Sequence, residues 1–307
     1  MAFKLHPDLP LTAEIARVLR EQLTDAIALV TDRKIPAKTR IHEGRTAGKK
    51  IRAALKLVRT RNPGVYRREN RRVRDAAREL SGVRDADVLL DCFASLLKRD
   101  AKTVRPVLFA GIQRALRAHR DATAPSSTDI EARLRRYAAA LRKAEKNLRA
   151  WKPRGDFADL ADDFRRSYRR ARVAFTAVKK ASKPHAESFH EWRKASKAYS
   201  HHCRLLRAAW PPAMKELLEE LRALSRLLGD EHDLSVLLDT LRQLATARAP
   251  GLREDKVAAA FALIEARRAA LRTEALALGT RLYVDKPRAV KARLAHWWNV
   301  AREERSD

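Results

Sequence analysis

The sequence of 307 residues is poor in cysteine and lacks a long apolar run. Its two cysteines, Cys92 and Cys203, form no CxxC pair, so neither a disulfide scaffold nor a zinc site is expected, and a reducing cytosol fits this usage. No run of about 18 apolar residues is present, which argues against a membrane-spanning helix. Residues 1–10 contain no apolar segment of the kind that a signal peptide needs. These absences predict a cytoplasmic protein without a metal or another cofactor.

Acidic residues are scarce beside the basic ones. The chain carries 67 Lys and Arg but 38 Asp and Glu, and its formal net charge is +29 at pH 7. A field of that size attracts polyanions. Arginine outnumbers lysine by more than two to one, and its planar guanidinium can grip two phosphate oxygens at once. Nucleic acid, an acidic membrane surface and inorganic polyphosphate are therefore the candidate partners.

Glycine is also scarce, at 9 residues, and no segment has a convincing strand pattern. Proline and glycine instead separate long stretches of Ala, Leu, Arg, Lys and Glu that carry helical periodicity. We predict about ten to twelve helices with short loops. Residues 121–128 and 152–156 are the clearest linkers. The pair Thr128 and Glu131 has the spacing of a capping box, which predicts the start of a helix.

One pattern occurs twice, 148 residues apart and without a gap. The motif H-E-x-R-x-A-x-K begins at His42 and again at His190, and the same offset holds over residues 14–91 of the first copy. A constant offset of this length indicates two copies of one structural unit. We therefore predict an all-α fold of two pseudo-symmetric tandem helical bundles, the first in residues 1–152 and the second in residues 153–307.

Basic residues line one face of each predicted histidine helix. Their positions advance by three and four, which places them on one stripe beside a separate apolar stripe. Solvated faces usually mix charges of both signs, yet residues 41–59 contain a single acid, Glu43. A plain solvated face is the alternative, but the repetition of the row favours an anion-binding face. The two faces consist of His42, Arg45, Lys49, Arg52, Lys56 and Arg59, and of His190, Arg193, Lys197, His201, Arg204 and Arg207.

Further basic residues lie on the neighbouring predicted helices. If the two copies pack face to face, these rows line one shared groove or cavity. A linear polyanion would bind there through many equivalent phosphate contacts, with an affinity that falls steeply as salt rises. The additional residues are Lys50, Arg74, Arg78, Arg165, Arg169, Arg172, Arg222 and Arg226.

The two histidines at the start of the motif, His42 and His190, have three possible roles. Each can bind phosphate, sense pH because a nearby phosphate would raise the pKa of its imidazole, or hydrogen-bond a neighbouring helix. Metal binding is the weakest interpretation. No pair of histidines four residues apart is accompanied by an acid on the same predicted helix, and no cysteine cluster is present.

A second repeated element lies further along each copy, at residues 81–88 and 229–236. It is predicted to be a turn in which Gly82 or Gly229 ends one helix. Asp85 or Asp233 is predicted to cap the next helix through its carboxylate. The alternative is that these two carboxylates orient an arginine or histidine of the binding face. A catalytic role is not predicted for either of them.

These two motifs, present twice in an arginine-rich helical chain, resemble the CHAD family, the conserved histidine α-helical domain. The resemblance covers nearly the whole chain and is strongest in the string FHEWRK that contains His190. It implies two pseudo-symmetric helical bundles around a basic cavity, binding of inorganic polyphosphate, and targeting to polyphosphate granules in prokaryotic cells. The carried-over site residues are His42, Arg45, Lys49, Lys50 and Arg52 in the first copy and His190, Arg193 and Lys197 in the second.

The chain departs from the family pattern in its first histidine helix, which Gly44, Thr46 and Gly48 should soften because glycine costs about 1 kcal/mol in a helix. A triphosphate-cleaving tunnel domain, which accompanies many relatives, is not recognisable in the sequence.

Two other functions compete with non-enzymatic polyphosphate binding. A nucleic-acid-binding protein would usually offer aromatic platforms for base stacking, whereas aromatic residues make up 6% of this chain and the basic faces contain none. Binding to a nucleic-acid backbone therefore remains open. A phosphotransfer enzyme with His42 or His190 as the phosphoryl acceptor is less favoured. It would need a phosphate loop rich in glycine or paired metal-binding acids, and neither is recognisable.

Overall fold

The computed structural model describes residues 3–81, 85–100 and 105–304, and within these ranges all regular secondary structure is helical and no strand is present. The predicted all-α class is confirmed. The eleven α-helices are α1 (Leu11–Thr31), α2 (Ala37–Lys56), α3 (Pro63–Glu79), α4 (Asp85–Arg99), α5 (Ala110–Thr123), α6 (Ser127–Arg149), α7 (Phe157–Lys180), α8 (Ala186–Leu205), α9 (Pro211–Thr246), α10 (Glu254–Leu282) and α11 (Pro287–Glu303). Two short 3₁₀ helices, η1 (Pro106–Phe109) and η2 (Arg207–Ala209), complete the described part of the chain.

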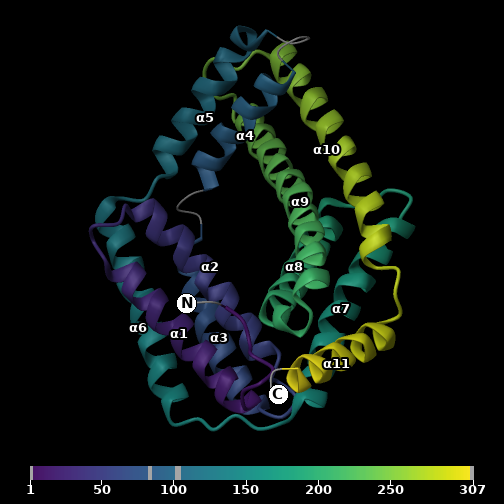
Figure 1. Cartoon of the computed structure of the whole chain (residues 1–307). Coiled ribbons are helices and arrows are strands. Elements are labelled where there is room, and N and C mark those ends of the chain that lie inside the picture. The colour runs from purple at the N-terminus through teal and green to yellow at the C-terminus, as the bar shows by residue number, and fades with distance from the viewer. Residues whose placement is uncertain (1–2, 82–84, 101–104, 305–307) are drawn as a thin grey trace.

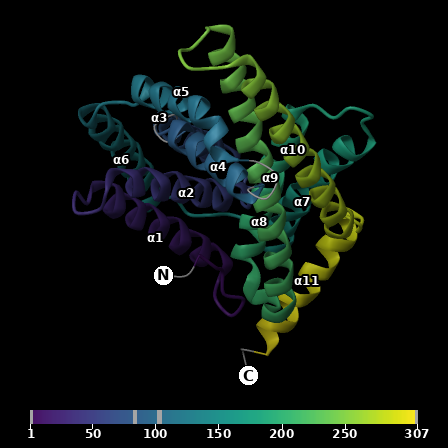
Figure 2. The same cartoon turned by 90° about the horizontal axis from the view of Figure 1, so that it is seen from above.

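The helices form three groups around the middle of the molecule (Figure 1). Helix α1 packs against α2 and α6, and α3 packs against α2 and α6 as well. On the other side α7 packs against α8 and α11. Helices α4 and α5 meet the long helices α9 and α10 in the upper part of Figure 1, where the second half of α9 packs against α10. Figure 2 shows the same group from above. Helix α8 contacts both α2 and α9, so the two histidine helices lie where the groups meet.

Two hydrophobic cores hold these groups together. The first core joins α1, α2, α3 and α6 to α7, α8, α11 and the first half of α9. The second core joins α4, η1 and α5 to the second half of α9 and to α10. Both cores therefore contain residues from each side of the sequence boundary at residues 152 and 153. That boundary lies in a non-helical segment between α6 and α7.

The helix bounds run parallel to the offset in the sequence. Helix α8 begins and ends 149 residues after α2, and α9 begins 148 residues after α3. Whether the two halves superpose in three dimensions stays a prediction.

The predicted turn in the second copy is wrong, because α9 continues through it. Gly229 and Asp233 both lie inside the helix. Leu228 and Leu234 on either side are buried, and the carboxylate of buried Glu231 accepts hydrogen bonds from arginines of α10 at 2.7–3.3 Å. Packing against α10 thus outweighs the roughly 1 kcal/mol cost of one glycine in a helix. In the first copy, Gly82 and the side chain of Asp85 lie outside the described residues.

The predicted capping box of α6 is also wrong. The N-cap of α6 is Ser126, whose hydroxyl accepts a hydrogen bond from the backbone N–H of Asp129 at 3.1 Å. Thr128 lies inside the first turn, and the carboxylate of Glu131 is taken by the buried guanidinium of Arg40 on α2. The loop before α6 comprises residues 124–126 and lies inside the predicted linker at residues 121–128, whose two ends belong to α5 and α6.

Two glycines let α2 sit close to its neighbours. The hydroxyl of Tyr137 on α6 donates a hydrogen bond to the Gly44 carbonyl at 2.7 Å. A Cβ at Gly48 would lie 2.8 Å from that hydroxyl, and a Cβ at Gly44 would lie 2.9 Å from Val30 on α1. These distances are shorter than a van der Waals contact. The glycines that soften the helix in isolation are thus required by its packing in the fold.

Candidate anion-binding site

The site is built around the contact between α2 and α8. The imidazole of His202, which is fully buried on α8, donates a hydrogen bond from Nε2 to the Ala53 carbonyl on α2 at 3.1 Å. At the end of α2, the Arg59 guanidinium donates to the buried Asp163 carboxylate of α7 at 3.0 Å. The first contact fixes α2 against α8, so their basic faces become neighbours, and the second fixes the end of α2 against α7. Arg59 is held by an ion pair and does not face the site with a free charge.

Five basic side chains from α2 and α8 come together beside this contact. We call them the central cluster: Arg45 and Lys49 on α2, and Arg193, Lys197 and His201 on α8. Lys49 is exposed; desolvation by the protein around it, and then the charges of Arg45 and Arg193, lower its pKa. Burial and the charges of Arg193 and Lys49 lower the pKa of Lys197 to about 8. The mutual repulsion shows that charges from both helices act on one another.

The central cluster is poor in acidic partners. Among the described residues, none of its five side chains forms an ion pair with a carboxylate. The charge of Asp233 on α9 acts on Arg193 and Lys197 and partly offsets their repulsion. The Nε of Arg193 is buried and has no hydrogen-bond partner. Since like charges that are removed from water destabilise the fold, the cluster is electrostatically suited to receive an anion.

A pair of histidines borders the cluster. The rings of His190 on α8 and His232 on α9 lie 4.5 Å apart between centroids, and Nδ1 of His190 is buried without a partner. Burial, followed by the charges of Arg193 and His190, lowers the pKa of His232 to about 4. Burial and then the charge of Lys194 also lower the pKa of His190. Both shifts disfavour the charged, imidazolium form of these rings.

The other predicted histidine has different surroundings. The side chain of His42 is 55% exposed, and its Nε2 lies 3.8 Å from a carboxylate oxygen of Glu43. The repeat aligns His42 with His190, but the two imidazoles do not have equivalent environments.

A second basic group continues along α2. Burial and the charges of Arg74 and Arg78 lower the pKa of Arg52, although Tyr66 opposes them. The Arg52 guanidinium donates to the Asn70 side chain at 3.0 Å. Burial and the charges of Arg170, Arg52 and Arg59 lower the pKa of Lys56 to about 8. Side chains of α3 and α7 therefore extend the basic face of α2 away from the central cluster.

Several other predicted site residues make contacts within the protein. Arg165 pairs with Asp162 at 3.1 Å, and Arg172 donates to the Tyr283 carbonyl at 3.0 Å. Arg169 is exposed on the same helix, α7. Among the described residues, no hydrogen bond or ion pair joins Arg165, Arg169 or Arg172 to the central cluster. On α7, Arg170 is the arginine whose charge reaches Lys56.

The remaining predicted residues lie toward the end of α8 and on α9. The charge of Arg204 acts on His201, and Lys50 lies 6.0 Å from the ring centre of Phe3. Arg207 donates to the carbonyls of Phe3 and Arg204 at 3.0 and 3.2 Å. Arg222 and Arg226 are both exposed on α9.

Sequence reasoning did not select His232 and Arg170 as site residues. His232 occupies the position of Arg84 in the repeat, and this exchange of one basic residue for another was the available signal. Arg170 lies in a run of arginines on α7, and the sequence does not show which arginine of the run faces α2. The rotation of α7 decides this, and the burial of Ala171 and Phe175 fixes that rotation in the fold.

Metal binding has no candidate site in the described part of the chain, where no three His, Cys, Asp or Glu side chains are grouped to hold an ion. No described helix is both long and apolar enough to cross a membrane.

Comparison with known proteins places the chain in a family. The family model for the CHAD domain matches residues 14–242, and no curated protein matches the chain. The crystal structure of the CHAD domain from the plant Ricinus communis is similar, with a TM-score of 0.63 and 19% sequence identity. The similarity covers 94% of this chain and 96% of that chain, and at this identity it shows the fold alone. Because the family model spans more than half of the sequence and includes both histidine helices, the chain belongs to the CHAD domain family.

Proposed function

We propose that this protein binds inorganic polyphosphate at the central cluster and does not chemically change it. The observation that carries the proposal is the convergence of like charges from two helices: Arg193 of α8 lowers the pKa of Lys49 on α2, and Arg193 and Lys49 lower the pKa of Lys197. A linear polyanion supplies a row of negative charges that relieves this repulsion at several points at once. Each phosphate bound there also displaces condensed counterions, which adds a salt-dependent gain.

A phosphate chain fits the cluster better than nucleotide bases do. The one aromatic ring that touches a cluster member in the described contacts is Phe3, which meets the His201 ring edge-on at 6.4 Å between centroids. Phe3 is itself buried, at 6% exposure. Single-stranded nucleic acids gain affinity by stacking bases on exposed rings, and a buried ring provides no such surface. Duplex DNA, which presents its phosphates outside, is therefore the stringent competitor.

The proposal is binding rather than phosphoryl transfer. In an enzyme His190 would have to attack a phosphorus atom, and its ring is packed against His232 beside further cations. Incubation with ATP or polyphosphate followed by intact mass measurement tests this directly. An unmodified protein agrees with binding alone, and a phosphoryl adduct on His190 contradicts it.

Binding through the central cluster would place the protein at polyphosphate granules in the cytoplasm. A fluorescent fusion should then concentrate on granules in cells that store polyphosphate and become diffuse when their polyphosphate is removed.

The main experiment measures the affinity for long-chain polyphosphate over a series of salt concentrations, with and without duplex DNA at equal phosphate concentration. We expect tight binding that DNA does not displace. In the double variant Arg45→Glu/Arg193→Glu, the affinity should fall by about 100-fold or more. The slope of log affinity against log salt should fall by about two or more, because each lost phosphate contact removes about one unit.

A control variant with the same charge change separates a local site from a general field. Arg117→Glu/Arg281→Glu reverses two exposed arginines on α5 and α10 that form no ion pair among the described residues. If this control lost affinity as strongly as Arg45→Glu/Arg193→Glu, the net charge alone would explain binding. If DNA bound equally or more tightly, the proposed ligand would be a nucleic-acid backbone and not polyphosphate.

A further inference from the structure

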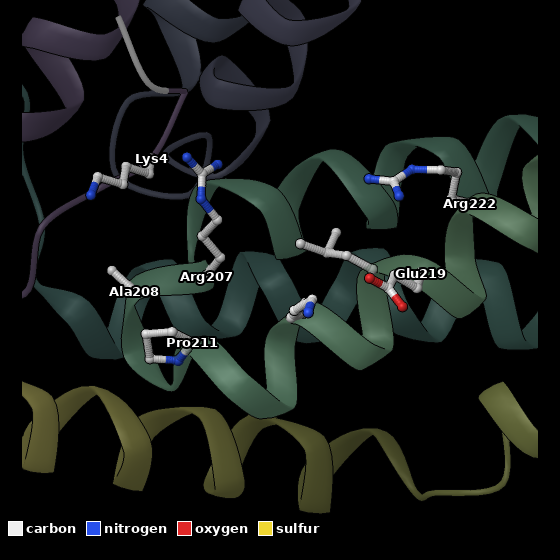
Figure 3. Close-up of a pocket in the computed structure, with 8 residues that line it drawn as sticks. Lys4, Arg207, Ala208, Pro211, Glu219 and Arg222 are labelled. Carbon is white, nitrogen blue, oxygen red and sulfur yellow. The ribbon is translucent and has the colours of Figure 1, made fainter.

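A recess outside the central cluster lies where η2 leads into α9 (Figure 3). It has a volume of about 260 Å³. We call it the α9 recess, and its lining consists of Lys4, Arg207, Ala208, Pro211, Lys215, Leu218, Glu219 and Arg222.

The α9 side of the recess is a single helix face. Pro211, Lys215, Leu218, Glu219 and Arg222 follow one another at steps of four, three, one and three residues, which keeps them on the same side of the helix. Figure 3 shows the guanidinium of Arg222 extending along α9 toward Arg207. Two arginines thus frame the recess from two different elements.

The opposite side of the recess is held in place by the N-terminal segment. The backbone N–H of Leu5 donates to the Leu205 carbonyl at 2.8 Å, and the Arg207 guanidinium donates to the Phe3 carbonyl at 3.0 Å. Arg17 on α1 donates to the Lys4 carbonyl at 2.9 Å. Because the segment is fastened at three consecutive residues, the recess is a built feature of the fold.

The recess carries a net positive charge. Four cations and one acid, Glu219, line it. Lys4, Lys215 and Arg222 form no ion pair among the described residues, and Glu219 pairs with none of them. Burial and the charge of Arg204 lower the pKa of Arg207. The acids Glu216 and Glu220 of the same helix do not line the recess.

A row of basic residues along α8 and into η2 leads from the central cluster to the recess. Lys197 acts on His201, Arg204 acts on His201, and Arg204 also acts on Arg207 at the edge of the recess. Lys197 and Arg207 are ten residues apart, a span of about 15 Å along helical chain. Asp233 is the one acid that acts on this line in the described interactions, and it does so at Lys197.

We propose that the α9 recess is a second binding compartment for the same polyanion, reached by a chain that already occupies the central cluster. This inference rests on the proposed function. A chain long enough to span α8 fills both compartments, whereas tripolyphosphate is too short to do so. Linked occupation raises affinity because the second contact is made within one complex. The protein therefore selects long phosphate chains over short ones.

The test compares two ligands on the full chain, long-chain polyphosphate and tripolyphosphate. The variant Lys215→Gln/Arg222→Gln removes two exposed charges of the recess without introducing a new one. We expect its affinity for long-chain polyphosphate to fall by about tenfold or more, with a salt slope reduced by about two. Its affinity for tripolyphosphate should stay within about twofold of the unchanged protein.

The control variant Lys180→Gln/Arg281→Gln removes two exposed charges elsewhere, on α7 and α10, and should leave both affinities unchanged. Unaltered long-chain affinity in Lys215→Gln/Arg222→Gln would overturn the second compartment. An equal loss for both ligands would also overturn it, because the recess would then bind short chains by itself. If Arg45→Glu/Arg193→Glu instead keeps full affinity, the proposed function at the central cluster fails, which is a separate result.

Discussion

The two histidine helices solve one packing problem in opposite ways. In the first half α2 supplies the space, with Gly44 and Gly48, and α6 supplies the bulk, with Tyr137. In the second half α8 supplies the bulk, with the fully buried Trp192, and α10 supplies the space, with Gly279. A Cβ at Gly279 would lie 2.7 Å from both Phe175 and Trp192. Space and volume have changed sides between the two copies.

In both halves a glycine accommodates an aromatic side chain of the neighbouring helix. This exchange separates packing from ligand contact. On the packed side of the helix the residue type changes between the copies, since Gly44 aligns with Trp192. On the basic side the charge is kept, since Arg45 and Lys49 align with Arg193 and Lys197. The first half is therefore not a weakened version of the second, even though its histidine helix contains two glycines.

The largest expected effect comes from removing the bulk of the second half. Trp192→Ala should lower the free energy of unfolding by about 3–5 kcal/mol, because it leaves a large cavity in the first core. Urea unfolding followed by circular dichroism measures this loss. Trp210→Ala is the control, since Trp210 is 47% exposed, and it should cost less than about 1 kcal/mol. A loss at Trp192 no larger than at Trp210 would show that this ring does not fill the space beside Gly279.

Filling the space on either side should have the next largest effect. Gly48→Ala and Gly279→Ala place a methyl group against aromatic atoms at 2.7–2.8 Å, and each should cost about 1–3 kcal/mol of unfolding free energy. Gly229→Ala on α9 is the matched control, because its Cβ would meet nothing within 4 Å. Alanine should stabilise the protein there by about 0.5–1 kcal/mol. The free energy of unfolding should therefore fall in Gly48→Ala and Gly279→Ala and rise in Gly229→Ala. If all three substitutions raised it, the space at Gly48 and Gly279 would not be required for packing.

The last comparison concerns pH and belongs to the second half. His201, His202 and His232 occupy positions that hold Ala53, Ala54 and Arg84 in the first copy. Burial lowers the pKa of His202 to about 3 in the folded protein, from an ordinary value of 6.5. Between these values the unfolded chain binds a proton that the folded chain does not. Stability is then fully present above about pH 6.5 and falls as the pH decreases toward 3, by up to about 1.4 kcal/mol per pH unit.

Urea unfolding at several pH values from 7.5 to 5 measures that slope. The variant His202→Gln retains a donor for the Ala53 carbonyl and removes the titration, so its stability should depend less on pH. Polyphosphate should oppose the loss, because a bound anion raises the pKa of His201 and His232 beside it. If the stability of His202→Gln changed with pH as steeply as that of the unchanged protein, His202 would not be the source of the pH dependence.

The helical class and the stripes could be predicted from sequence because they depend on local periodicity. Steps of three and four residues place Arg45 and Lys49 on one side of α2 whatever surrounds the helix. The charge of Arg193 acts on Lys49 only because α2 packs against α8. Contacts between residues far apart in sequence set this packing, and His202 and Ala53, which are 149 residues apart, form one of them. No local pattern contains that information.

The incorrect predictions have the same origin. Gly229 has the local character of a helix end, but the burial of Leu228 and Leu234 and the ion pairs of Glu231 extend α9 through it. Glu131 has the spacing of a capping residue, but its carboxylate pairs with Arg40 of another helix. In each case a contact distant in sequence outweighed a local preference worth about 1 kcal/mol.

The second core also has a consequence for how the chain is made. Leu116 of α5 packs in that core with Leu234 of α9, which leaves the ribosome 118 residues later. At ordinary rates of synthesis of about 5–20 residues per second, α4 and α5 wait roughly 6 to 24 s for their partners. During that interval their apolar faces are uncovered, so they are natural clients for chaperones. The second core is therefore completed only after most of the chain has been synthesised.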